Sequence, residues 1–207
     1  MNIKDVDGVP PSDNFIKSIF ERQLQLEEKY KEIEGFPWPW PLEIDIPNNQ
    51  IWLKDVMWRV TEELAESMEA EINKDSLHQA EELSDALHFL VQLMLMSGIA
   101  WDDSLPIFLI PGVQAEKLYL NIPIKSDIIH NYWAVVYYLG LAGNCLKSKK
   151  WKQTPMLTDK DRYKDYLRWA FFSLLAIFKR LNYTFEEVYI IYYKKSAVNE
   201  FRQRTKY

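Results

Sequence analysis

The chain of 207 residues is 48% hydrophobic, which is enough for one domain with a substantial buried core. Its formal net charge of −5 argues against non-specific binding of nucleic acid, because that function needs a broad basic surface. A single cysteine, Cys145, excludes an intrachain disulfide and a thiolate zinc cluster, and it suits a reducing compartment.

Apolar residues recur at intervals of three and four over most of the chain, so we predict an all-α fold, a helical bundle. The first helix is predicted over 14–34 and ends before FPWPWPLEIDIP, whose four prolines exclude a regular helix. A second helix is predicted over 50–73. A third is predicted over 76–98, with Ser76 and Gln79 in the pattern of a capping box.

Three prolines interrupt residues 102–125, which we predict to be a loop with short helical turns. Helices are then predicted from 126 or 127 to 146 and from 158 or 159 to 181. A capping box of Thr184 and Glu187 opens a last helix toward the C-terminus. We expect a single α-helical domain over 1–207, in which 102–158 is the candidate for a smaller mobile lobe.

Membrane insertion and secretion are not expected. No apolar run reaches the roughly 18 to 20 uninterrupted residues of a membrane span, and the N-terminal MNIKDVDGVPPSDN lacks the apolar stretch of a secretory signal. We therefore expect a soluble, cytoplasmic protein with neither a membrane nor a nucleic acid among its partners.

Two consecutive helices each carry carboxylates three residues apart, a spacing that places both on one side of a helix. Glu63 and Glu66 lie in TEELAESMEAE, and Glu82 and Asp85 lie in HQAEELSDALHFLVQLMLM. In the second segment they begin a polar stripe along an otherwise apolar helix, and the stripe continues with His88 and Gln92.

The short connection between these helices makes them antiparallel neighbours whose carboxylates can face each other. Four converging carboxylates repel one another unless a cation binds them. Mg²⁺ suits such a site because it takes hard oxygen ligands and leaves positions for substrate phosphates. Taken alone, the two pairs also fit glutamates that only solvate a helix surface.

Near the C-terminus, YYKKSAVNEFRQRTKY places Lys195, Asn199 and Arg202 at i, i+4 and i+7, on one side of the last helix. An ammonium, an amide and a guanidinium together suit a polyphosphate. No acidic residue lies four positions from any of the three, so we expect them to bind a ligand anion and the helix to close on it. A solvated helix end that complements the helix dipole is the alternative.

In this order, ELAE, ELSDALHF and YYKKSAVNEFRQRTKY resemble motifs of the dimeric, all-α dUTPases and the related phage dCTPase-dUTPases, which are MazG-like nucleoside triphosphate pyrophosphohydrolases. The resemblance implies Mg²⁺-dependent hydrolysis of a deoxynucleoside triphosphate to its monophosphate and pyrophosphate, with dUTP as first candidate. The implied catalytic and Mg²⁺-binding residues are Glu63, Glu66, Glu82 and Asp85. The implied substrate-binding residues are Gln23, His88, Lys195, Asn199, Arg202 and Tyr207. dCTP with dUTP, or a broader range of nucleoside triphosphates, is the alternative.

The resemblance further implies a homodimer, which the many aromatic residues after 126 also favour, because a small core does not readily bury them. Glu63 is expected to orient or deprotonate the attacking water. Lys195 and Arg202 are expected to stabilise the departing pyrophosphate. His88 is either a substrate contact or a core histidine with satisfied hydrogen bonds.

Three positions depart from the family pattern. Ser196 stands where asparagine is usual, Lys206 stands where glycine is usual, and Glu27 lies near the place of an asparagine that reads the edge of the base. The identity of the base therefore stays open.

Two other classes of protein also stay open. A di-iron carboxylate bundle is suggested by Asp85 with His88 and by Asp127 with His130, although such bundles usually combine Glu-x-x-His from two helices with single glutamates from two others. A non-catalytic helical interaction protein is the other alternative. In such a protein, the alignment of Lys195, Asn199 and Arg202, which we name the terminal row, would be coincidental.

Overall fold

The structure, a computed structural model, describes residues 8–12, 14–35, 37–100, 127–148 and 157–204. These residues form six α-helices and no strand, which confirms the predicted all-α fold. The helices are α1 (Phe15–Glu34), α2 (Pro47–Ile72), α3 (Ser76–Met96), α5 (Ile128–Cys145), α6 (Lys160–Arg180) and α7 (Phe185–Arg204). None of them is long and apolar enough to cross a membrane.

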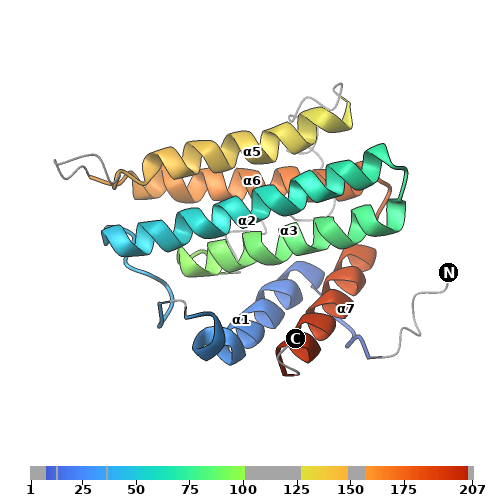
Figure 1. Ribbon diagram of the computed structural model, residues 1–207, viewed down its shortest axis with the longest axis horizontal. Helices are drawn as coiled ribbons and strands as arrows, with labels where there is room; N and C mark the ends of the chain where they lie inside the picture. The colour runs from blue at the N-terminus through green and yellow to red at the C-terminus, as the bar shows by residue number, and fades with distance from the viewer. Residues whose placement is uncertain (1–7, 13, 36, 101–126, 149–156, 205–207) are drawn as a thin grey trace.

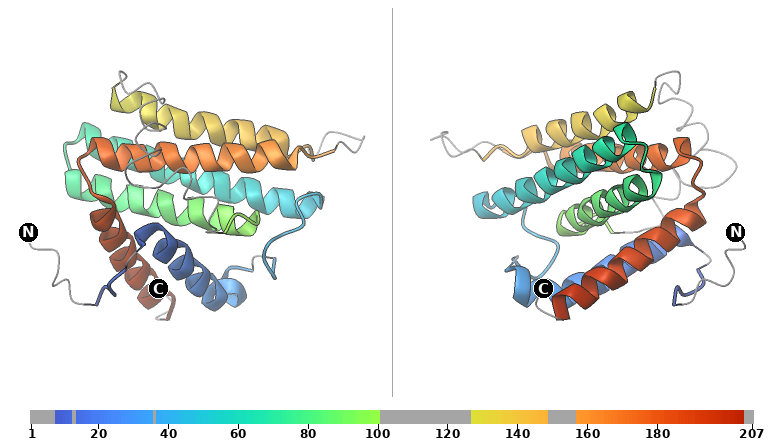
Figure 2. Two further views of the ribbon diagram at one scale, coloured as in Figure 1. Left: turned by 180° about the vertical axis from the view of Figure 1, so that it is seen from behind. Right: turned by 45° about the vertical axis from the view of Figure 1, so that its right-hand side comes forward.

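The helices pack as three pairs (Figure 1). α5 and α6 lie side by side, α2 and α3 form an antiparallel pair next to them, and α1 and α7 run obliquely across the other side of α3 (Figure 2). α3 contacts α1, α2, α6 and α7, so it lies at the centre of the molecule. The predicted antiparallel arrangement of the two carboxylate-bearing helices is therefore present.

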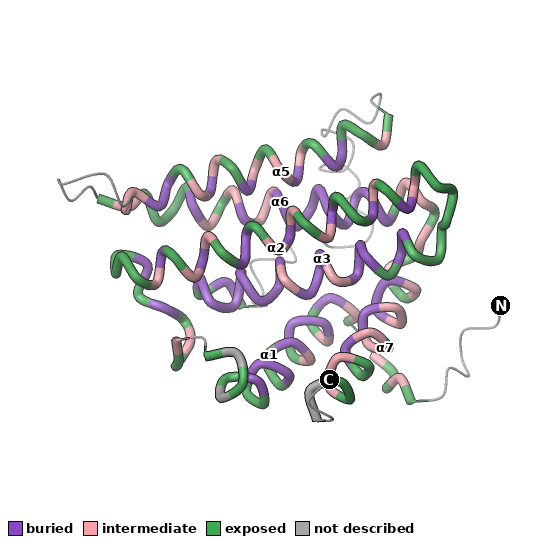
Figure 3. The backbone as a smooth tube through the Cα atoms, viewed as in Figure 1, coloured by how far each residue is buried: buried purple, intermediate pink, exposed green. Residues whose placement is uncertain are grey.

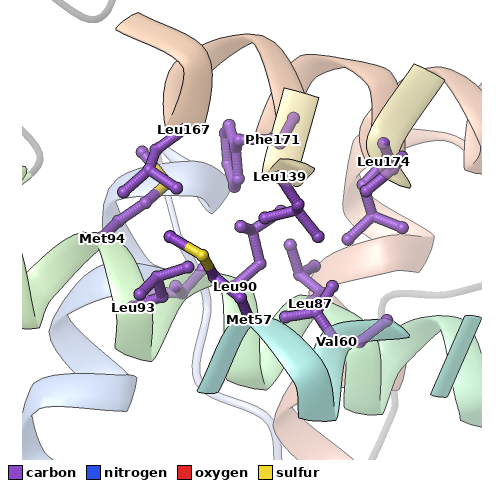
Figure 4. Packing of buried hydrophobic residues seen from close by; sticks show 14 of the residues in the cluster. Met57, Val60, Leu87, Leu90, Leu93, Met94, Leu139, Leu167, Phe171 and Leu174 are labelled. Carbon is purple, nitrogen blue, oxygen red and sulfur yellow. The ribbon is translucent and has the colours of Figure 1, made fainter. Parts of the chain in front are cut away.

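The main core lies between α2, α3, α5 and α6. Met57, Leu90, Leu139 and Phe171 come from these four helices in turn and meet there (Figure 4). α3 is buried along nearly its whole length (Figure 3). Each fully buried aliphatic side chain contributes about 1.5 to 3 kcal/mol, so this core holds α3 in place while its opposite side carries polar residues toward α1 and α7.

Local signals define most helix ends. Asn14 caps α1 by accepting a hydrogen bond from the Lys17 amide at 3.1 Å, and Gly35 ends the helix in the left-handed region at φ +68°. The predicted capping box before α7 is present: the Glu187 carboxylate accepts from the Thr184 amide at 2.7 Å, and the Glu187 amide donates to the Thr184 hydroxyl at 3.2 Å.

One predicted helix cap and one predicted helix start were wrong. The cap of α3 is Asp75, whose carboxylate accepts from the His78 amide at 3.1 Å, whereas Ser76 is already the first helical residue. A carboxylate in the cap position satisfies the same free amides, so the box of Ser76 and Gln79 is not used. α2 begins at Pro47 rather than at 50. Proline is favoured at the first position of a helix, because the amide hydrogen that it lacks has no partner within the first turn.

The predicted loop over 102–125 lies outside the described residues. The same holds for most of the candidate lobe over 102–158. Its described part includes α5, which packs against α6 and α2. The division of the chain into one domain with a mobile lobe stays a prediction.

Candidate active site

Glu63, Glu66 and Glu82 form a cluster of carboxylates between α2 and α3, which we name the acidic cluster. One oxygen from each lies within 4.8 Å of the others. Glu63 is half-buried, Glu66 is exposed and Glu82 is buried. Burial, a hydrogen bond with Glu82 and the neighbouring negative charges raise the pKa of Glu63 to about 8. These oxygens fit a divalent cation, because their mutual repulsion is relieved by positive charge and all are hard ligands.

Asp85 lies one turn after Glu82 on α3 and forms an ion pair with α7. Its Oδ2 is 2.8 Å from Lys195 Nζ, and both side chains are mostly buried. Its Oδ1 is buried with no hydrogen-bond partner among the described residues. Burial raises the pKa of Asp85, although Lys195 acts in the opposite direction. Lys195 therefore has an acidic partner, on α3 rather than on its own helix.

Beside the acidic cluster, a cavity of about 410 Å³ opens between α1, α2, α3 and α7. Its volume is within the range of small-molecule sites. Residues from all four helices line it: Gln23, Leu26, Glu27, Tyr30, Glu63, Asp85, His88, Phe89, Gln92, Asn199 and Arg202. The cavity thus brings together carboxylates of both acidic motifs and two members of the terminal row.

Gln23, Glu27 and Gln92 form a hydrogen-bonded group in this cavity, which we name the polar wall. Glu27 is only 4% exposed. It accepts from Gln23 Nε2 at 2.6 Å and from Gln92 Nε2 at 3.1 Å. Because a carboxylate only accepts, it fixes the orientation of both amides, and the Tyr192 hydroxyl then donates to Gln23 Oε1. Each amide group keeps a second N–H for other acceptors.

His88 is buried against α7, where its ring stacks on Tyr192 with centroids 3.8 Å apart and planes within 5°. Its Nδ1 lies 2.8 Å from the Ser84 carbonyl and therefore donates to it. Burial lowers the pKa of His88 to about 4, so the ring is neutral at physiological pH. Nε2 is then an acceptor, and it has no partner among the described residues. His88 is a half-satisfied histidine that lines the cavity.

Of the six predicted substrate-binding residues, Gln23, His88, Asn199 and Arg202 line the cavity. Lys195 adjoins it through Asp85, and Tyr207 lies outside the described residues. Of the four predicted metal-binding carboxylates, Glu63 and Asp85 line the cavity, and three form the acidic cluster without Asp85.

The sequence reasoning gave no role to Gln92 or Arg22, whereas it placed Glu27 near a position that reads the base. Gln92 did carry a signal, because it continues the polar stripe of α3. Arg22 carried none, since its partners on α7 lie 174 and 178 residues away in the chain.

The two Asp and His pairs that suggested a di-iron site make other contacts in the structure. Asp127 caps α5, and its Oδ1 lies 2.8 Å from His130 Nδ1 with both side chains exposed. His88 Nδ1 is bound to a backbone carbonyl. The acidic cluster contains no histidine ligand among the described residues.

A family model described as dUTPase matches residues 60–207, which extend from the middle of α2 to the end of the chain. The chain belongs to the dUTPase family. It is accordingly a hydrolase of the dUTP diphosphatase type. No curated protein and no solved structure matches it. The matched segment contains the four carboxylates and the terminal row, whereas Gln23 and Glu27 of the polar wall precede it.

Proposed function

We propose that the protein hydrolyses dUTP to dUMP and pyrophosphate in this cavity, in a Mg²⁺-dependent reaction. The observation that carries the proposal is the lining of one cavity by carboxylates, by Asn199 and Arg202 of the terminal row, and by the polar wall. Gln92 follows Asp85 by seven residues, about 10 Å along α3, which leaves room for a sugar between a base and a phosphate chain.

Glu63, Glu66, Glu82 and Asp85 would hold the cation. Bound there, Mg²⁺ supplies positive charge to phosphate oxygens and makes water more acidic. Glu63 both lines the cavity and belongs to the acidic cluster, so its carboxylate is placed to orient a water molecule and to take a proton from it.

The terminal row would bind the triphosphate. Arg202 and Asn199 line the cavity from α7, where a guanidinium fork and an amide can donate to phosphate oxygens. Lys195 adds a third donor and lies beside Asp85, so it adjoins the cation-binding carboxylates. These donors would stabilise charge on the leaving pyrophosphate.

The polar wall would read the base. The second N–H groups of Gln23 and Gln92 can donate to carbonyl oxygens of uracil, and His88 Nε2 can accept a hydrogen from the nucleoside. This arrangement supports a pyrimidine, because its edge combines carbonyl acceptors with an N–H donor.

A release assay for pyrophosphate with dUTP tests the proposal. We expect dUMP and pyrophosphate in equal amounts with Mg²⁺, no release after EDTA treatment, and recovery when Mg²⁺ is restored. Release of inorganic phosphate instead, or activity unaffected by EDTA, would contradict it.

Glu27 favours dCTP as a second candidate substrate. A carboxylate accepts well from the N4 amino group of cytosine, whereas it repels the two carbonyl oxygens that flank N3 of uracil. If dCTP is also cleaved, Glu27→Gln should lower kcat/KM for dCTP by about tenfold relative to dUTP. An unchanged ratio of the two values would remove Glu27 from base selection.

A further inference from the structure

Arg22 of α1 contacts α7 at three successive positions along one side. Its Nε donates to the Ser196 hydroxyl at 2.6 Å, its Nη2 donates to Glu200 Oε2 at 2.8 Å, and its guanidinium lies 5.0 Å from the centroid of the Tyr193 ring. Its side chain is only 11% exposed. α1 and α7 run side by side in both figures of the fold, so the contact joins two packed helices (Figures 1 and 2).

Glu200 is held from α1 at both of its oxygens. Lys29 Nζ lies 2.6 Å from Oε1, while Arg22 occupies Oε2. These two bonds lower the pKa of Glu200 to about 2, so the carboxylate stays ionised at any working pH. Lys29 is half-exposed, whereas Arg22 is mostly buried, so Arg22 is the partner less screened by water.

These contacts bear on the cavity through the geometry of α7. Glu200 directly follows Asn199 and precedes Arg202 by two residues, and both of those line the cavity. The side of α7 formed by Tyr193, Ser196 and Glu200 faces α1. A helix that rotated or shifted there would move Asn199 and Arg202 away from the cavity, because all side chains on it turn together.

We propose that Arg22 is a positioning residue, which fixes the rotation and register of α7 and thereby presents Asn199 and Arg202 to the phosphates of the substrate. The inference rests on the proposed function. Arg22 does not itself line the cavity, so it acts through α7. A guanidinium suits this role because its donors lie on three nitrogens and reach a hydroxyl and a carboxylate at the same time. The ammonium of lysine carries all its donors on one nitrogen and does not span the two groups in this way.

Arg22→Met tests the proposal, since it keeps the length of the side chain and removes its donors and charge. We expect kcat/KM for dUTP to fall by about tenfold or more, mainly through a higher KM. Backbone hydrogen exchange should become faster over 193–204 while exchange over 76–96 is unchanged. Lys17→Met is the matched control, because Lys17 lies on the same helix in an exposed pair with Glu21, and it should alter neither measurement.

Two further variants separate positioning from general stability. Arg22→Lys keeps the charge but not the fork, so it should retain the folded structure and still lose most of kcat/KM. Glu200→Gln should repeat the effect of Arg22→Met. The double variant should lose little more than either single one, because both remove the same contact.

Three results would overturn the inference: kinetics of Arg22→Met within about twofold of wild type, additive losses in the double variant, or exchange that rises equally in every helix. Failure of the proposed function looks different, since the wild-type protein itself would then release no pyrophosphate from any nucleotide.

Discussion

The acidic cluster and the polar wall both keep a carboxylate inside the protein, but they surround it differently. Glu27 of the polar wall accepts hydrogen bonds from the amides of Gln23 and Gln92, so both of its oxygens have partners within the chain. Glu63 faces other carboxylates, and the proton it retains is the result of burial and repulsion. At one end of the cavity the buried carboxylate is thus supported by hydrogen bonds from the chain itself, while at the other end carboxylates repel one another, a repulsion that a bound cation would relieve.

The largest effect is expected at the acidic cluster, where we propose that a cation binds. Glu66→Gln should lower dUTP turnover by about a thousandfold or more, because it removes one of the charges proposed to bind that cation. Glu66 is exposed, so the fold should be kept, and relief of repulsion should raise the thermal stability of the metal-free protein. Pyrophosphate release and thermal unfolding measure the two effects.

Glu69→Gln is the control for this variant, as Glu69 is another exposed glutamate of α2. It should keep activity within about twofold. Comparable activity in Glu66→Gln would remove Glu66 from the metal site.

Arg202→Ala should have the next largest effect. Losing a preorganised donor at developing charge costs about 2 to 4 kcal/mol of transition-state stabilisation, which should appear in kcat with dUTP. Lys194→Ala, at an exposed position on the same helix, should leave kcat nearly unchanged. Equal losses in both variants would mean that α7 contributes only general positive charge.

A smaller effect should appear in stability against pH. The pKa of Glu63 is about 8 in the folded protein against 4.5 in the unfolded chain, so the folded form binds the extra proton between these values. Metal-free protein should therefore lose stability as pH rises from 4.5 to 8. Allowing for the half-exposed position of Glu63, the loss is on the order of 1 to 2 kcal/mol.

Denaturant titrations of metal-free protein at several pH values measure this slope. Glu63→Gln should flatten it, since glutamine does not titrate. A slope that survives the substitution would assign the shared proton to other carboxylates of the acidic cluster.

The smallest effect on activity is expected from a substitution in the subunit interface of the proposed homodimer. Ile129, Trp133 and Tyr137 are exposed at four-residue spacing on α5, which does not line the cavity. Trp133→Ser should therefore weaken self-association in sedimentation while activity per chain stays within about threefold. A wild-type monomer at micromolar concentration would contradict the dimer.

The parts of the fold and site that could be predicted depend on short-range spacing. Glu63 with Glu66 and Glu82 with Asp85 share helix sides whatever else the chain does, and Asn14 and Thr184 cap helices through contacts within three residues. The cap of α3 was missed because Asp75 and Ser76 are neighbouring residues of two types that both cap helices, so the sequence pattern does not decide between them.

The rest depends on how distant helices pack, which spacing does not reveal. The burial of Glu27 follows from α1 lying against α3, and the pairing of Asp85 with Lys195 follows from α7 lying against α3. The residue types show only that Glu27, Asp85 and Lys195 can carry charge. The packing of the helices provides the partner of each.

The ion pair of Asp85 and Lys195 has a consequence for which form of a nucleotide is admitted. A polyanion without a cation that bound Lys195 would leave the mostly buried carboxylate of Asp85 unpaired. A cation alone that bound Asp85 would leave the ammonium of Lys195 unpaired in the same way. A nucleotide that arrives already carrying its cation supplies both exchange partners at once. On the proposed assignment, the protein should therefore bind the cation complex of the triphosphate in preference to the metal-free triphosphate. Free phosphate and other metal-free anions in the cell should compete poorly.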